Sequence, residues 1–135
     1  MSAHLQVGTT LPPLSVPPIS RTTLALFAGA SGDHNPIHID LDVARSAGLG
    51  DVFAHGMLSM AYLGQAVRSW APQERLRRWS VRFTAITPLH AVVTCRGEVV
   101  ELFEEDGERR ARLKIGAWTS TNLQTLDGEA VIAIA

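Results

Sequence analysis

The chain has 135 residues, a net charge of −1 and a single cysteine, Cys95. This length fits one domain, 1–135, and the near-neutral charge offers no cationic excess for binding a nucleic acid. One cysteine excludes an internal disulfide and a cysteine-based zinc site. The chain starts with no cationic, apolar leader and has no run of about 18 apolar residues, so we expect a cytoplasmic protein that does not bind a membrane.

The first predicted elements are short. Residues 11–20 contain four prolines, which indicate an extended lead-in or an edge strand, because proline cannot donate to a strand ladder. The apolar residues 24–28 predict a short helix that ends at Gly29 and Gly32. A second short helix is predicted to follow Asp40, whose carboxylate can cap it.

The longest predicted helix spans residues 55–70. Its apolar residues occupy most faces of the helix, so it is expected to be buried on nearly all sides.

The second half of the sequence has the patterns of strands. Residues 79–85 alternate between apolar and polar, and residues 91–103 are rich in β-branched residues. Asp106-Gly107 indicates a hairpin turn before a second alternating run, 111–117. Asp127-Gly128 is interpreted as a further turn, followed by a last strand.

A helical first half and an antiparallel second half predict an α+β fold. The economical packing wraps the sheet around the long helix of residues 55–70, which is the hot-dog arrangement. One such domain leaves an exposed sheet edge, so we expect a homodimer or a higher oligomer.

The stretch SGDHNPIH, residues 31–38, has too many functional groups for an ordinary loop. It can be a polar turn and nothing more, since Asn-Pro favours a turn. Alternatively, the turn brings Asp33 and His38 to one point, where a carboxylate and an imidazole can share a water and move its proton.

A metal site is a further alternative for this stretch. His34 and His38 are four residues apart, with His55 and carboxylates elsewhere in the same region. On a helix that spacing binds zinc, but Pro36 interrupts it and no third ligand has the spacing of a known motif. The sequence therefore predicts no metal.

Two further positions are candidates for substrate binding. Gly56 follows His55 at the start of the long helix, where unpaired N–H groups can bind a substrate carbonyl that approaches the glycine closely. His55 itself is interpreted as structural rather than catalytic. Arg82 is either a solvated charge or a phosphate contact.

The motifs FAGASGDHNPIHID, DVARSAGLG and AHGMLSMA are similar to those of the MaoC-like hydratase/dehydratase family. The chain resembles (R)-specific enoyl-CoA hydratases and mycobacterial (R)-3-hydroxyacyl-ACP dehydratase subunits. The resemblance is strong over residues 24–62 and weaker over residues 79–89.

The resemblance implies reversible hydration of trans-2-enoyl thioesters of CoA or ACP to (R)-3-hydroxyacyl thioesters, with no cofactor. It implies that Asp33 and His38 activate the water, as catalytic groups, and that the N–H of Gly56 binds the thioester carbonyl. Which of the two side chains acts as base and which as acid stays open. The other residues expected at the substrate site are Asn35, which sets the local geometry, His55, Met57 and Arg82.

Where the sequence departs from the family pattern, Asp33 and His38 are unchanged, and the departure affects which substrate is preferred. Gly64 stands where some members have a serine hydroxyl, which leaves the acyl group undetermined. Two alternatives remain: a hot-dog thioesterase and a non-catalytic acyl-binding subunit. Residues 57–70 contain no Asp or Glu, which argues against a thioesterase, and the presence of both Asp33 and His38 argues against a non-catalytic role.

Overall fold

The computed structural model describes residues 5–134. The helices are α1 (Arg21–Ser31), α2 (Leu41–Ser46) and α3 (Gly56–Trp70), with 3-10 turns η1 (Pro36–His38) and η2 (Gln73–Arg75). The strands are β1 (Leu14–Ser15), β2 (Leu76–Phe83), β3 (Val93–Glu105), β4 (Glu108–Thr119) and β5 (Gln124–Ala133). The prediction that a single domain spans residues 1–135 stays a prediction.

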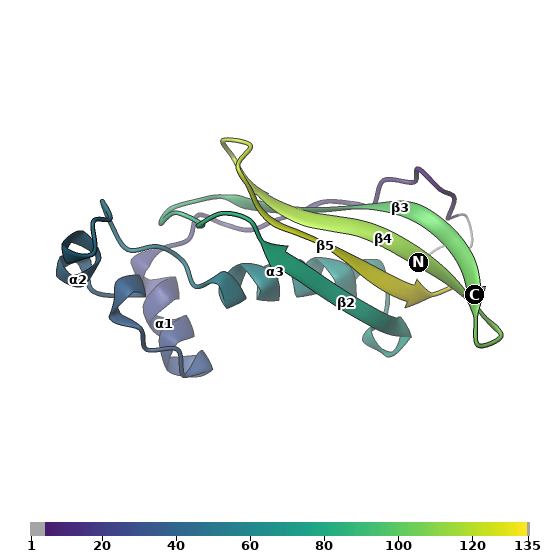
Figure 1. Cartoon of the computed structure of the whole chain (residues 1–135), viewed down its shortest axis with the longest axis horizontal. Coiled ribbons are helices and arrows are strands. Elements are labelled where there is room, and N and C mark those ends of the chain that lie inside the picture. The colour runs from purple at the N-terminus through teal and green to yellow at the C-terminus, as the bar shows by residue number, and fades with distance from the viewer. Residues whose placement is uncertain (1–4, 135) are drawn as a thin grey trace.

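The strands form one antiparallel sheet in the order β1-β3-β4-β5-β2. The sheet curves over α3, while α1 and α2 form a separate lobe beyond one end of the sheet (Figure 1). The predicted α+β hot-dog fold is confirmed. Within the described residues, no helix is long and apolar enough to cross a bilayer.

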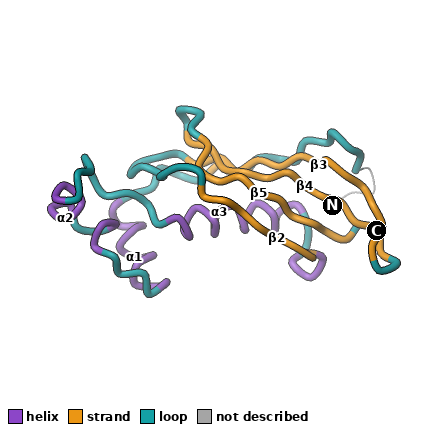
Figure 2. Tube along the Cα trace, in the orientation of Figure 1, coloured by secondary structure: helices purple, strands orange, loops and turns teal. Residues whose placement is uncertain are grey.

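Helix α3 is buried on its sheet side only. Leu58, Leu63 and Ala66 are buried, whereas Met57 and Gln65 are exposed. The expectation of burial on nearly all faces is therefore wrong for the single chain, because a sheet of five strands covers one side of the helix. Figure 2 shows the helix running along one side of the sheet.

Two glycines bring α3 close to β2. A Cβ on Gly64 would lie 2.8 Å from the indole of Trp79, and a Cβ on Gly56 would lie 3.0 Å from the ring of Phe83. Trp79 and Phe83 are four residues apart and point to the same face of β2. The predicted alternation on this strand is thus the pattern that packs the two aromatic rings against α3.

The ends of the short helices follow the sequence with one exception. The hydroxyl of Ser20 accepts the N–H of Thr23 at 3.0 Å, and Asp40 caps α2 in the same way. Helix α1 continues through Gly29 and ends at Gly32, which is left-handed with φ 77°. The prediction that Gly29 ends the helix is wrong, since a glycine with ordinary dihedrals weakens a helix without stopping it.

The two Asp-Gly pairs adopt different structures. Asp106-Gly107 forms the predicted hairpin turn, with φ of 54° and 73°. The turn predicted at Asp127-Gly128 is wrong, because both residues lie inside β5. The chain reverses instead before β5, where Asn122 has φ 64°. Gly128 lies opposite Val81 of β2. The backbone of β2 comes so close that no Cβ fits at this position, which the sequence alone does not reveal.

Candidate functional site

The loop between α1 and α2 is built from local side-chain to backbone hydrogen bonds. After Gly32 ends α1, a carboxylate oxygen of Asp33 accepts the N–H of Asn35 at 3.3 Å. The amide oxygen of Asn35 then accepts the N–H of Ile37 at 3.2 Å and caps η1, which begins with Pro36. These bonds reverse the chain between Asp33 and His38, as the turn interpretation expects.

His38 is held in one tautomer by a backbone carbonyl. Its side chain is buried, and Nδ1 lies 2.7 Å from the carbonyl oxygen of Phe53. A carbonyl can only accept, so Nδ1 carries the proton and donates it. In the neutral ring, Nε2 therefore has a free lone pair. The ring of Phe53 also packs edge-on against the imidazole, with centroids 4.8 Å apart.

His55 contacts both His38 and Asp33. It is 1% exposed, and its Nε2–H donates to the carbonyl oxygen of Asp33 at 3.2 Å. The imidazoles of His55 and His38 are stacked, with centroids 4.0 Å apart. Burial lowers the pKa of His55, and the nearby His38 lowers it further, so the His55 imidazole is neutral at neutral pH.

The three titratable side chains form one cluster. One carboxylate oxygen of Asp33 and one ring nitrogen each of His38 and His55 lie within 4.8 Å of one another. Two histidines and a carboxylate are a donor set that divalent metals accept. However, Nδ1 of His38 and Nε2 of His55 already bond backbone carbonyls, so each ring has one nitrogen left. The expected absence of a metal stays a prediction.

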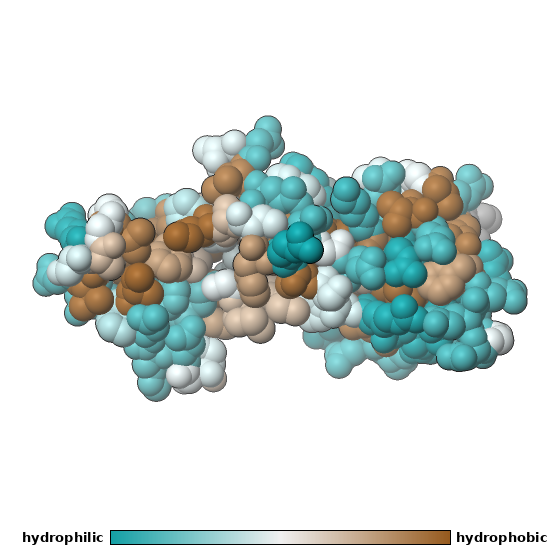
Figure 3. Space-filling view, viewed as in Figure 1, coloured by the Kyte–Doolittle hydropathy of each residue, from teal (hydrophilic) through white to brown (hydrophobic). Residues whose placement is uncertain are grey.

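Gly56 stands at the edge of a cavity beside the cluster. The cavity has a volume of about 370 Å³ and is lined by residues that include Phe53, Gly56 and Phe83. Apolar surface gathers between the helical lobe and the sheet (Figure 3). Because Gly56 is the first residue of α3, its N–H has no acceptor within the helix. A polar donor therefore borders a space lined by apolar side chains and by four hydroxyl residues, Ser59, Thr84, Thr87 and Thr125.

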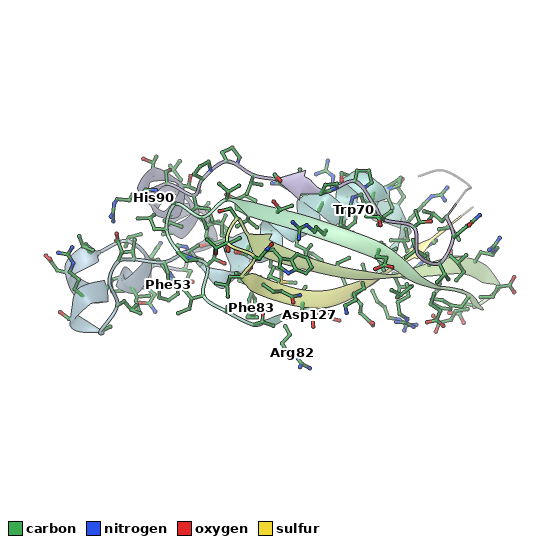
Figure 4. The ribbon with its side chains drawn as sticks, turned by 90° about the horizontal axis from the view of Figure 1, so that it is seen from above. Phe53, Trp70, Arg82, Phe83, His90 and Asp127 are labelled. Carbon is green, nitrogen blue, oxygen red and sulfur yellow. The ribbon has the colours of Figure 1, made fainter. Side chains whose placement is uncertain are left out.

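The remaining predicted residues lie farther from the cluster. Met57 is 56% exposed at the start of α3, and His34 is exposed on the outside of the turn. Arg82 extends away from the ribbon near Asp127, its partner across the strands (Figure 4). Since neighbours along a strand alternate faces, Arg82 points away from the face on which Phe83 contacts Gly56. A phosphate contact by Arg82 stays a prediction.

Cys95 has no features of a nucleophile. It is fully buried in β3, and burial raises the pKa of its thiol to about 12. The thiol therefore stays protonated at neutral pH and serves as a small core side chain.

Comparison with known proteins assigns the family. The family model described as a MaoC like domain matches residues 6–120. The chain belongs to this MaoC-like dehydratase family. Its enzymes are hydro-lyases, and so is this protein.

Individual relatives resemble this MaoC-like protein in sequence and in structure. It is 30% identical to a 3-hydroxybutyryl-CoA dehydratase of Methylorubrum extorquens, over 86% of this chain and 73% of that protein. The R-hydratase PhaJ1 of Pseudomonas aeruginosa matches with a TM-score of 0.84 and 30% identity, over 97% of this chain and 83% of that one. An (R)-hydratase of A. caviae also gives a TM-score of 0.84, with 25% identity over 99% and 100% of the two chains.

One contributor to the site of this MaoC-like protein was not predicted. Phe53 orients His38 through its backbone carbonyl. Every residue except the last has such a carbonyl, so no residue type could have indicated it.

Proposed function

We propose that the protein hydrates trans-2-enoyl thioesters reversibly to (R)-3-hydroxyacyl thioesters. Asp33 and His38 activate the water, and the N–H of Gly56 binds the thioester carbonyl. The observation that carries the proposal is the hydrogen bond from Nδ1 of His38 to Phe53, which leaves a lone pair on Nε2 of a ring that lies beside the carboxylate of Asp33.

His38 suits the role of base in the hydration direction. Its free Nε2 accepts a proton from the water, while a carboxylate oxygen of Asp33 accepts a hydrogen bond from the second hydrogen, which stays on the oxygen, and so orients the attack on C3. As the C–O bond forms, electrons move toward the thioester oxygen. The proton then returns from the same pair to C2, so that one water adds across the double bond on one face of the substrate.

The start of α3 suits the charge that develops during this reaction. The N–H of Gly56 points out of the first turn, where the helix dipole favours negative charge. A donor in that place stabilises an enolate oxygen more than a ground-state carbonyl. The packing of Phe83 gives Gly56 a second, structural reason to be a glycine.

The cavity beside Gly56 is lined in part by Phe53, Phe83 and Ile86, which supports an acyl group as the bound part of the substrate. Relatives named for 3-hydroxybutyryl-CoA and enoyl-CoA support CoA thioesters as the first class to test. ACP thioesters are the second class. We propose a reaction without cofactor, in the cytoplasm.

The direct test is an assay of the purified protein with trans-2-enoyl thioesters of increasing chain length, on CoA and on ACP. We expect the absorbance of the conjugated enone to disappear without release of thiol, and the product to be the (R)-3-hydroxyacyl thioester. Release of free thiol in place of hydration would identify a thioesterase. No reaction with any chain length on either carrier would contradict the proposal.

A homodimer is the proposed assembly. Strand β2 has eight residues and, among residues 5–134, pairs on one side only, with β5, so its other edge is open to pair with a second copy. Ile86, just beyond β2, is 51% exposed and Phe83 is 52% exposed. These apolar side chains next to a free strand edge are what a partner would cover.

Light scattering after size-exclusion chromatography tests the assembly. We expect about twice the mass of the 14.6 kDa chain, and we expect Ile86→Asp to shift the protein to the monomer, because an interface must then desolvate a charge. Leu123→Asp, on the turn before β5, is the matched control with a similarly exposed apolar residue. A wild-type protein that elutes as a monomer would refute the dimer.

A further inference from the structure

His55 contacts both members of the proposed catalytic pair without access to solvent. It is 1% exposed, so it reaches only neighbouring protein groups and cannot bind a substrate as the sequence suggested. Although it is the N-cap residue of α3, its side chain makes no capping hydrogen bond. The imidazole is turned away from the helix end and toward the loop between α1 and α2.

The ring of His55 has three defined neighbours. Nε2–H donates to the carbonyl oxygen of Asp33 at 3.2 Å, and one face stacks on His38. Phe27 of α1 packs against the ring at a steep angle, with centroids 4.9 Å apart. The imidazole thus links three segments, and its own backbone precedes Gly56.

The protonation state of His55 follows from these contacts. The carbonyl of Asp33 fixes the proton on Nε2. Nδ1 is buried and has no hydrogen-bond partner among the described residues 5–134, so a second proton there would be a buried donor without an acceptor. The titratable groups near it are His38 and Asp33, while α1 contributes only the aromatic Phe27. His55 therefore stays neutral while His38 exchanges protons.

We propose that His55 is the positioning residue of this site. Through its hydrogen bond to the Asp33 backbone and its stack on His38, it fixes the water-activating pair relative to the N–H of Gly56, the next residue along the chain. This inference rests on the proposed function. It adds a role for a buried side chain that touches neither substrate nor water.

The physical consequence concerns turnover more than binding. The water held by Asp33 and His38 must reach C3 while the carbonyl is bound at Gly56. A displacement of about 1 Å between these groups can lower a rate by about 10²-fold. Loss of the His55 contacts would introduce such a displacement while leaving the cavity that binds the acyl group intact.

Three substitutions separate the contacts of His55. His55→Gln places an amide N–H where Nε2–H lies and keeps the hydrogen bond to Asp33. His55→Phe keeps an aromatic ring against His38 but has no donor. His55→Leu removes both contacts. Val99→Ala is the control for loss of stability, since it removes buried volume from β3, a strand that contributes no residue to the site.

With crotonyl-CoA, we expect kcat to fall about 10²-fold in His55→Leu and in His55→Phe, with KM changed less than threefold, and to recover to within about tenfold of wild type in His55→Gln. Val99→Ala should lower the thermal midpoint with little effect on kcat. Equal activity of His55→Phe and wild type, or equal loss in the Gln and Phe variants, would overturn the proposal. If His55→Leu does not fold, the Gln and Phe pair decides.

Nitrogen-detected NMR of the imidazoles gives a readout that does not need turnover. We expect His55 to be neutral and in the Nε2–H tautomer at neutral pH, and the His38 signals to move or broaden in His55→Leu but not in His55→Gln. A His55 that carries its proton on Nδ1, or that is doubly protonated at neutral pH, would overturn the positioning role. If wild type hydrates no thioester but shows the expected spectra, the proposed function fails and the arrangement of the site stands.

Discussion

Replacement of His38 by alanine is expected to lower crotonyl-CoA hydration by about 10³-fold or more, which brings it close to undetectable. Without Nε2, the site loses the group that we propose takes the proton from the attacking water. Asp33→Asn is expected to be similarly inactive, because a neutral amide oxygen holds the water more weakly than a carboxylate and cannot take up a proton. The assay is the loss of enone absorbance, with folding checked by circular dichroism.

Two variants make this result specific to the chemistry. His38→Asn keeps a donor at the place of Nδ1 and can still bond the carbonyl of Phe53, so it removes the base while preserving the local contact. His34→Ala changes an exposed histidine in the same turn and should retain wild-type activity. Full activity in both His38→Asn and Asp33→Asn would disprove the proposed mechanism.

Substitution of Gly128 by alanine is expected to destabilise the fold by about 3 kcal/mol. A Cβ at this position would lie 2.1 Å from the carbonyl oxygen of Ser80 and 2.9 Å from the Cα of Val81. Both atoms belong to the backbone of β2, so relief requires the two strands to move apart. We expect the thermal midpoint to fall by about 10 °C.

Gly29→Ala is the matched control for this experiment. Gly29 lies in α1, is exposed, and a Cβ there would have no neighbour within 4 Å. Alanine should stabilise the helix by roughly 0.5–1 kcal/mol because it has a better helix propensity. An unchanged midpoint for Gly128→Ala would mean that the two strands separate easily at this point.

The sequence predicts the candidate pair for a local reason. Asp33, Asn35, Pro36 and His38 lie within six consecutive residues, and the turn they form depends on their own side-chain to backbone hydrogen bonds. Turn chemistry of this kind acts over two or three residues and can be interpreted without a tertiary structure. The alternatives of a plain turn and of a catalytic pair therefore describe the same geometry.

The tautomer of His38 and the burial of His55 could not be predicted in this way. Phe53 is 15 residues from His38, and His55 is 22 residues from the carbonyl that it bonds. These contacts exist only because α3 is packed beneath the sheet and the α1–α2 lobe is folded against its first turn. The assignment of His38 as base, which the sequence leaves open, depends on the first of them.

The fold likewise depends partly on local signals and partly on long-range packing. Periodicity, caps and the Asp106-Gly107 turn determined the helices and most strands, because these signals act between residues close in the chain. Asp127-Gly128 carries the same turn signal, yet it is a stretch of strand because β2 packs against Gly128 and extends the sheet through it. Local chemistry determined which groups this protein has for moving a proton, and long-range packing decided which nitrogen is free to do so.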